Sequence, residues 1–371
     1  MLPSGRMASW PLLAALLSAT GLGCGRVGFD PAASADASEA SRDGAAIGGN
    51  VAFVTSTTQT PVSLGDLAGA DVVCTARAAD AGLEGTYVAW LSVGEVRALD
   101  RLAGARGWVR TDGRPLVDRA EGILLGRVLH PLRIDEHGED VGGTVLAATG
   151  TRGDGRPGPD CSNLTEPAGT IVFGRPDQTG RSLTEGPGLA GEVACSEPLR
   201  LYCFGVDRAE ALSYARQSGR VAFVSSAFVV GGGLAAADAH CMGEAEAAGL
   251  TGNFVALLST TTASASSRFD LLGPTWVRPD GIPVASTPAA LVDGQLSTSI
   301  SVTADGRHVS GRVWTGGLSP DRLGTSTCAE WTDPAAMGDT GDPNGTSGDF
   351  FRRLNASSCT ETDRRLYCLE L

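Results

Sequence analysis

Short apolar patterns recur in the same order in the two halves of the chain. Residues 51–54 and 221–224 both read Val-Ala-Phe-Val before a hydroxyl residue, which predicts a buried strand in each half. Residues 67–82 place apolar and alanine positions at helical spacing and end in glycine, which predicts a helix with a glycine stop. Residues 234–249 repeat this pattern and predict a counterpart helix.

Further elements are expected in both halves. Residues 87–92 and 254–259 begin with an aromatic residue and continue as an apolar run, which we interpret as a central core strand. Trp108 and Trp276 each begin a short apolar segment that is followed by Asp-Gly, which predicts a tight turn. Leu-Tyr-Cys ends each half as another short strand.

Eight of the nine cysteines follow the same long period. They are Cys74, Cys161, Cys195 and Cys203 in the first half, and Cys241, Cys328, Cys359 and Cys368 in the second. A self-similar period of this length indicates one domain present twice. An even number of cysteines in each half predicts disulfides formed in an oxidising compartment, although spacing alone leaves three pairings per half.

These patterns divide the chain. We name residues 50–206 the first repeat and residues 220–371 the second repeat, and we expect each to form a domain. Residues 207–219 between them are polar, and we expect a short linker there, for which a helical form stays open.

The N-terminal segment predicts export. Residues 1–23 contain an apolar stretch of signal-peptide length, too short to span a membrane. The segment runs into Cys24 and resembles the lipobox of bacterial lipoproteins, although Gly21 stands where that family usually has leucine. An ordinary secretory signal with an incidental cysteine is the alternative. Lipid on Cys24 would anchor the chain to a bacterial outer membrane or cell surface, with residues 24–49 as a flexible tether.

Charge and motifs exclude several functions. The net charge of −13 opposes binding to nucleic acid or to heparin-like polyanions, because both need a positive field. The chain contains neither Gly-x-Ser-x-Gly nor His-Glu-x-x-His. Eight paired cysteines and one lipidated cysteine would leave no free thiol. We therefore expect no catalytic residues and no enzymatic activity.

Longer strings resemble a known family. Residues 69–92 of the first repeat, with Gly-Ala-Asp-Val-Val-Cys and Ala-Gly-Leu-Glu-Gly-Thr-Tyr-Val-Ala-Trp-Leu-Ser, resemble the start of the endostatin domain of collagens XV and XVIII. Residues 313–331 of the second repeat are similar to its tryptophan, glycine-rich stretch and Cys-x-x-Trp. Residues 356–359 and 366–368 match its closing segment. The resemblance spans both repeats and looks most like a bacterial lipoprotein family of unknown function.

The resemblance implies an α+β fold of two tandem C-type lectin-like domains. Each would have a twisted, mostly antiparallel sheet, two helices, long loops and two nested disulfides. The implied pairs are Cys74–Cys203, Cys161–Cys195, Cys241–Cys368 and Cys328–Cys359. The zinc-binding histidines of endostatin and the sugar-binding tripeptides of calcium-dependent lectins are absent from this sequence, so the fold is transferred and those activities are not.

Candidate metal ligands are few. Asp339, Asp342, Asn344 and Asp349 place oxygen atoms at short, glycine-rich intervals, a composition that suits Ca²⁺ but that also makes ordinary loops. We interpret the acidic segment 135–140, with the neighbouring His130 and its own His137, as a solvated loop, for which a weak divalent-metal site is the alternative. The recurring tryptophans are expected in the core, with a ligand groove as the alternative.

The expected function is non-enzymatic binding. Loops on a rigid scaffold would contact a glycan, a matrix polymer or another surface protein. A structural envelope component without a dedicated ligand is the alternative, and an extracellular hydrolase is the least favoured.

Overall fold

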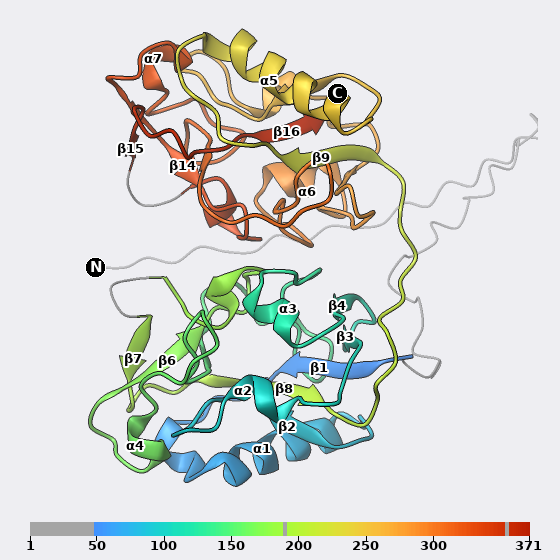
Figure 1. Cartoon of the computed structure of the whole chain (residues 1–371), viewed down its shortest axis with the longest axis vertical. Coiled ribbons are helices and arrows are strands. Elements are labelled where there is room, and N and C mark those ends of the chain that lie inside the picture. Colours follow the sequence, from blue (N-terminus) through green and yellow to red (C-terminus); the bar gives the residue numbers. More distant parts are fainter. Residues whose placement is uncertain (1–47, 188–190, 353–355) are drawn as a thin grey trace, which may run out of the picture. The chain divides into compact units, whose positions relative to one another are not determined.

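A computed structural model describes residues 48–187, 191–352 and 356–371. The expected signal peptide (1–23), the expected lipidation site Cys24 and most of the expected tether (24–49) lie outside the described residues. Residues 46–371 form one compact unit. The fold is mixed α+β, with short strands, few helices and four disulfides (Figure 1). Within the described ranges, no helix is both long enough and apolar enough to cross a bilayer.

The first repeat alternates strands with mostly short helices. Its strands are β1 (Asn50–Val54), β2 (Tyr87–Ala89), β3 (Trp108–Arg110), β4 (Pro115–Val117), β5 (Ala147–Ala148), β6 (Thr170–Gly174), β7 (Glu192–Ala194) and β8 (Arg200–Gly205). Its helices are α1 (Leu67–Asp80), α2 (Ala98–Arg101), α3 (Glu121–Leu124) and α4 (Cys161–Leu164), with 3₁₀ turns at Pro61–Leu64 and Arg181–Leu183.

The second repeat follows the same order. Its strands are β9 (Arg220–Val224), β10 (Phe254–Ala256), β11 (Trp276–Val277), β12 (Val313–Trp314), β13 (Met337–Gly338), β14 (Thr340–Gly341), β15 (Ser357–Ser358) and β16 (Tyr367–Glu370). Its helices are α5 (Gly233–Ala247), α6 (Pro288–Val292) and α7 (Cys328–Trp331), with 3₁₀ turns at Ser266–Arg268 and Gly348–Phe350. The linker 207–219 contains no helix.

The sheets have matching centres. In the first repeat the strand order is β4-β3-β1-β8-β5-β6-β7, and β1 runs antiparallel to β8 and parallel to β3. In the second repeat the order β10-β16-β9-β11 reproduces this centre, with β9 antiparallel to β16 and parallel to β11. The pairs β12–β14 and β13–β15 form two small separate sheets.

The strands that begin at Tyr87 and Phe254 are not central, so this part of our prediction was wrong. β2 pairs with β8 alone and β10 pairs with β16 alone, which places both strands at a sheet edge. A helix side chain occupies the free edge: the Ala89 amide donates to Asp71 of α1 at 2.9 Å. Apolar content predicted burial correctly, but burial under a helix looks the same in sequence as burial inside a sheet.

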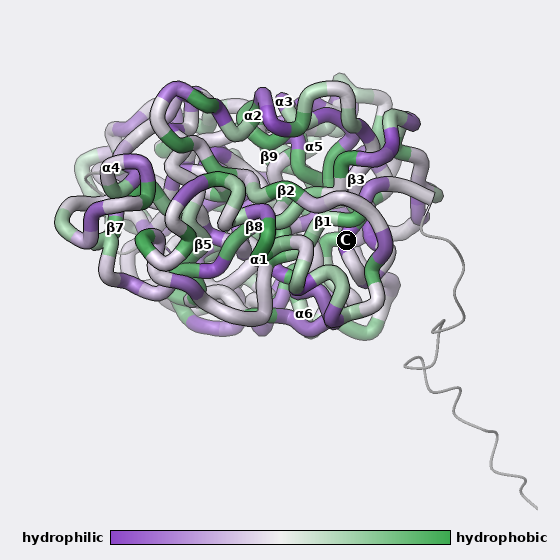
Figure 2. Tube along the Cα trace, turned by 90° about the horizontal axis from the view of Figure 1, so that it is seen from below, coloured by the Kyte–Doolittle hydropathy of each residue, from purple (hydrophilic) through white to green (hydrophobic). Residues whose placement is uncertain are grey.

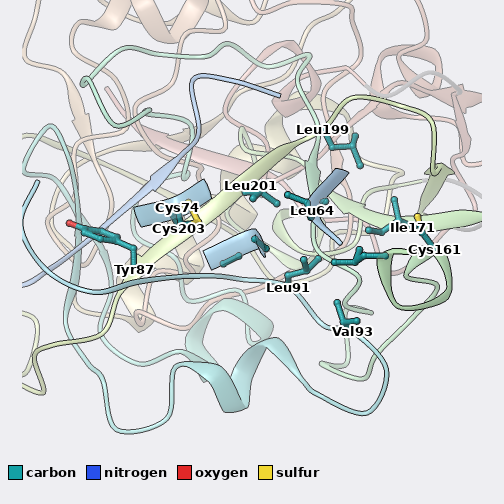
Figure 3. Packing of buried hydrophobic residues seen from close by; sticks show 14 of the residues in the cluster. Leu64, Cys74, Tyr87, Leu91, Val93, Cys161, Ile171, Leu199, Leu201 and Cys203 are labelled. Carbon is teal, nitrogen blue, oxygen red and sulfur yellow. A yellow bond between two sulfur atoms is a disulfide. The ribbon is translucent and has the colours of Figure 1, made fainter. Parts of the chain in front are cut away.

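Both faces of the central sheet are covered. Because side chains alternate along a strand, Phe53, Leu201 and Cys203 face α1, whereas neighbouring positions such as Tyr202 and Phe204 pack on the opposite face. Figure 3 shows the first of these clusters. Figure 2 labels β8 on the Cα trace, which is coloured by hydropathy. The second repeat has the same two clusters.

Helix α1 shows how the sequence sets an element. Asp66 caps its start by accepting a hydrogen bond from the Gly69 amide at 2.8 Å. Ala70, Cys74 and Ala78 recur every fourth position and form its buried stripe. The helix ends at Asp80, and Gly82 follows its C-cap with a φ of 70°, a left-handed conformation that glycine adopts without strain. The predicted glycine stop is therefore confirmed.

Each repeat contains two disulfides. They are Cys74–Cys203, Cys161–Cys195, Cys241–Cys368 and Cys328–Cys359, the nested order that the resemblance implies. The outer bridges tie α1 to β8 and α5 to β16 across the sheet. The inner bridges hold the first residues of α4 and α7.

Helices α4 and α7 are single left-handed turns. All four residues of each have positive φ, between 48° and 65°, and none of them is glycine. A left-handed conformation costs a non-glycine residue about 1–2 kcal/mol, so each turn needs outside support. The inner disulfide holds the first residue, and a side-chain cap from Asp160 or Thr327 accepts the amide of the third.

The two repeats also contact each other through equivalent segments. Gln178 and Gly345, each 17 positions after the second cysteine of its repeat, face each other across an antiparallel β-bridge. A pairing in which each segment meets its own counterpart is the arrangement of an isologous dimer interface. Here the two partners are parts of one chain.

Candidate functional site

The four predicted calcium ligands lie in the segment 339–349, where they make protein contacts. Asp339 and Asp342 are largely buried, and Asp342 Oδ1 accepts the Asn344 amide at 3.0 Å. Asp349 Oδ2 accepts from Arg175 of the first repeat at 2.8 Å. Among the described residues no three His, Cys, Asp or Glu side chains are grouped as metal ligands. Calcium binding at this segment stays a prediction.

Polar residues that recur in both repeats serve the fold. Asp71 of α1 binds the guanidinium of Arg101, whose Nη1 donates to the Ala89 carbonyl beneath the helix. Asp238 and Arg268 make the same contacts in the second repeat. The recurring tryptophans Trp108, Trp276, Trp314 and Trp331 are at most 1% exposed, so the core interpretation is confirmed. A ligand site is therefore expected where the repeats differ.

One such difference opens a cavity in the second repeat. The cavity has a volume of about 500 Å³, within the range of small-ligand sites. It lies between the end of α5, the segment after β9, the turn 302–308 and Arg365. Its lining includes Ser226, Glu244, Ala304, His308 and Arg365.

The turn that lines the cavity has an exact structural counterpart in the first repeat. The bridge between Val302 and His308 corresponds to the bridge between Ile134 and Asp140. Both turns contain a left-handed glycine and the same backbone hydrogen bonds. Ala304 therefore occupies the position that Glu136 holds in the first repeat.

Glu136 fills the corresponding space. Its side chain is buried, and its carboxylate accepts the Ser56 amide at 2.8 Å as well as the Ser56 hydroxyl. Our interpretation of residues 135–140 as a solvated loop is thus wrong for Asp135 and Glu136, which are 6% and 2% exposed. Sequence alone concealed this role because the partner, Ser56, lies 80 residues away.

In the second repeat another residue accepts the serine amide that Glu136 accepts in the first, while the Ser226 hydroxyl lies 3.4 Å from His240 Nε2. Glu244 of α5 accepts the Ser226 amide through both carboxylate oxygens, at 2.8 and 2.9 Å. Its counterpart on α1, three positions after the helix cysteine, is Arg77. The second repeat thus has Ala304 where the first has Glu136, and Glu244 where the first has Arg77. The small side chain of Ala304 leaves the cavity open.

The cavity holds groups in distinct charge states. Burial opposes ionisation of Glu244, but hydrogen bonds from His240 and Ser226 lower the pKa of its carboxyl. A hydrogen bond to Glu244 in turn raises the pKa of His240, which lies 3.3 Å away. Burial and the neighbouring Arg278 lower the pKa of His308 to about 4, so its imidazole is neutral at pH 7.

One lining group, Arg365, has unused hydrogen-bonding capacity. His308 Nδ1 also has no hydrogen-bond partner in the described part of the chain, but this atom is buried and does not face the open cavity. Arg365 Nη1 donates to the Ser225 carbonyl at 2.8 Å. Across the described ranges, no carboxylate pairs with the Arg365 guanidinium.

The sequence contained a signal for this site that motif reading did not use. Residues 287–326 are among the segments that differ most between the repeats, whereas the recurring motifs lie in the fold-forming parts. No family model matches the chain, and no curated protein matches it. The endostatin-like assignment therefore remains an expectation from sequence.

Proposed function

We propose that this chain is a lipid-anchored, non-enzymatic binding protein of the bacterial surface, built from two endostatin-like domains of C-type lectin-like fold. In this proposal the second repeat carries the ligand site and the first repeat supports it. The nested disulfides and the repeated helix–sheet packing support the two-domain reading.

One observation carries the binding proposal: Ala304 leaves open the space that Glu136 fills. A substitution that only preserved the fold would keep the serine amide bonded and leave no open space. The second repeat keeps the Ser226 amide bonded through Glu244, yet it retains an open, polar cavity. This is the arrangement expected of a site released from a structural role.

Hydrolysis is the less favoured function. Ser226, His240 and Glu244 lie together, but one ring nitrogen, His240 Nε2, faces both Ser226 Oγ at 3.4 Å and Glu244 at 3.3 Å. A base that activates a hydroxyl uses its two ring nitrogens for the two partners. This geometry suits a structural hydrogen-bond network better than an activated serine nucleophile.

The test is binding of the purified full chain to arrays of glycans and matrix polymers, with Ca²⁺ and again with EDTA. The key variant is Ala304→Glu combined with Glu244→Arg, which gives the second repeat the residues of the first. Arg77→Glu, at the counterpart position on α1, is the matched control.

A ligand retained by the control and lost by the double variant would support the proposal. A ligand that survives the double variant would move the site elsewhere. Failure to find any ligand, with stable co-purification with envelope proteins, would favour the structural alternative. Turnover of an ester, peptide or glycoside substrate would overturn the non-enzymatic reading.

A further inference from the structure

We infer that the cavity of the second repeat binds a single neutral sugar ring, held by side chains without a bridging metal ion. This inference rests on the proposed function and specifies its ligand. It is carried by the acceptor, the donor and the charge balance of the lining.

The acceptor is Glu244. Its carboxylate is ionised, because hydrogen bonds from His240 and Ser226 lower the pKa of its carboxyl against the effect of burial. An ionised carboxylate accepts hydrogen bonds and donates none. Glu244 therefore favours a ligand that donates hydrogen bonds.

The donor is Arg365. One of its guanidinium nitrogens donates to the Ser225 carbonyl, which fixes the side chain at the cavity wall. Arginine presents five N–H donors in a planar fork, so others remain to reach a ligand oxygen. A hydroxyl group both donates and accepts, and adjacent hydroxyls on a ring can meet the guanidinium and the carboxylate together.

The charges of the lining balance. Glu244 and Arg365 have opposite charges, and at the rim Asp305 pairs with Arg307 at 2.9 Å. A carboxylate or phosphate ligand would be attracted by Arg365 and repelled by Glu244, and a cationic ligand would meet the reverse. Since neither sign is preferred, the lining favours an uncharged polar molecule.

The remaining wall suits the carbon face of a ring. Ala247, Ala248, Ala304 and Val309 present methyl groups to the cavity. A small ring with hydroxyls at its edge and C–H groups on its face has this combination of surfaces. The volume of about 500 Å³ leaves space for one ring and part of a second.

The experiment titrates the full chain with free monosaccharides and follows binding by saturation-transfer difference NMR. The neutral probes are D-glucose, D-galactose, D-mannose and N-acetylglucosamine, and the charged probes are D-galacturonate and D-glucosamine. We expect at least one neutral ring to bind, with or without EDTA, and its charged counterparts to bind about tenfold more weakly.

Matched variants locate the site. Glu244→Gln and Arg365→Gln should each weaken binding of the neutral ring about tenfold. Glu246→Gln, on the exposed side of the same helix, and Arg200→Gln, which removes the equivalent arginine of the first repeat, should leave binding unchanged. Ala304→Glu should abolish binding by filling the cavity.

Three results would overturn the inference. They are equal or tighter binding of a charged ring, loss of binding in EDTA, and neutral-ring binding that survives Glu244→Gln. If no ring binds but an array ligand depends on residues 304 and 244, the proposed function stands and this inference alone fails. If neither a ring nor an array ligand is found, both fail.

Discussion

Thr179 and Thr346, at equivalent positions in the two repeats, donate their backbone amides to each other's segment. The Thr179 amide donates to the Asn344 carbonyl at 3.0 Å, and the Thr346 amide donates to the Asp177 carbonyl at 3.2 Å. The threonine hydroxyls bond the same carbonyls, at 3.3 and 2.7 Å. Both side chains are fully buried, so this pairing is a part of the core shared by the two repeats.

The charged group beside this pairing predicts a large effect of one substitution. Arg175 holds Asp177, whose side chain is fully buried, and also reaches Asp349. Arg175→Leu should lower the free energy of unfolding by about 3 kcal/mol, because it leaves a buried carboxylate without its cation. Burial already raises the pKa of Asp177, so the loss should shrink as falling pH protonates this group.

Urea unfolding of the full chain at several pH values measures this. Arg156→Leu is the control, because its ion pair with Asp154 is exposed and should contribute little. Equal effects of the two substitutions, or an Arg175 effect that does not depend on pH, would contradict the prediction.

The cavity difference makes a prediction in the first repeat. Glu136→Ala should open a cavity there and leave the Ser56 amide and hydroxyl without their acceptor. The free energy of unfolding should fall by about 1–3 kcal/mol. Chemical denaturation checks this against Glu139→Ala, an exposed residue of the same turn, which should change stability little. Similar losses for the two variants would show that Glu136 contributes no more than a surface residue.

The left-handed turns predict a stabilising glycine. Ala329 has φ 48° and ψ 62°, a conformation that strains alanine but not glycine. Ala329→Gly should raise the free energy of unfolding by about 0.5–1 kcal/mol, after the added freedom of the unfolded chain is deducted. Ala239→Gly, on the exposed side of α5, should lower it by about 1 kcal/mol. Thermal unfolding of both variants should thus shift in opposite directions.

A buried histidine predicts acid sensitivity. Burial, aided by Arg110, lowers the pKa of His130 from 6.5 to about 3, and its Nδ1 lies 2.8 Å from the Pro115 carbonyl. In this pH range the His130 imidazole is protonated in the unfolded chain but stays neutral in the folded chain. The free energy of unfolding should therefore fall as pH drops from about 6.5 toward 3. The slope is up to about 1.4 kcal/mol per pH unit.

His130→Asn offers an amide donor to the same carbonyl but cannot titrate. The variant should therefore show a flatter dependence of unfolding free energy on pH in that window. His137→Asn, at an exposed position, is the matched control substitution. An unaltered slope in His130→Asn would mean that other groups govern acid unfolding.

Local patterns predicted the elements well where the interactions are local. The helix stripe Ala70-Cys74-Ala78, the glycine stop and the Asp-Gly turn after Trp108 all depend on neighbours within a few residues. The edge position of β2 could not be predicted in this way, because it depends on which distant strands pair with β2, and β8 alone does. Apolar composition specifies burial, and the partner is set by the whole fold.

The candidate site was beyond motif reading for the same reason. Glu136 looks like one of several acidic loop residues until its contact with Ser56 is seen. The site arises from a missing side chain at Ala304, and an alanine carries no chemical signal of its own. Only the comparison of two copies of one fold within the chain reveals that something has been removed.

In the proposed function, the cavity of the second repeat fixes the stoichiometry of attachment. Since Glu136 fills the counterpart space, each chain offers this cavity once although its fold is doubled. Duplication of the domain therefore adds no second binding site of this kind to the chain. Avidity for a ligand would have to come from neighbouring chains. The time for which a polymer stays bound would then rise steeply with the density of chains on the surface. At low density the polymer would dissociate at the rate of a single weak site.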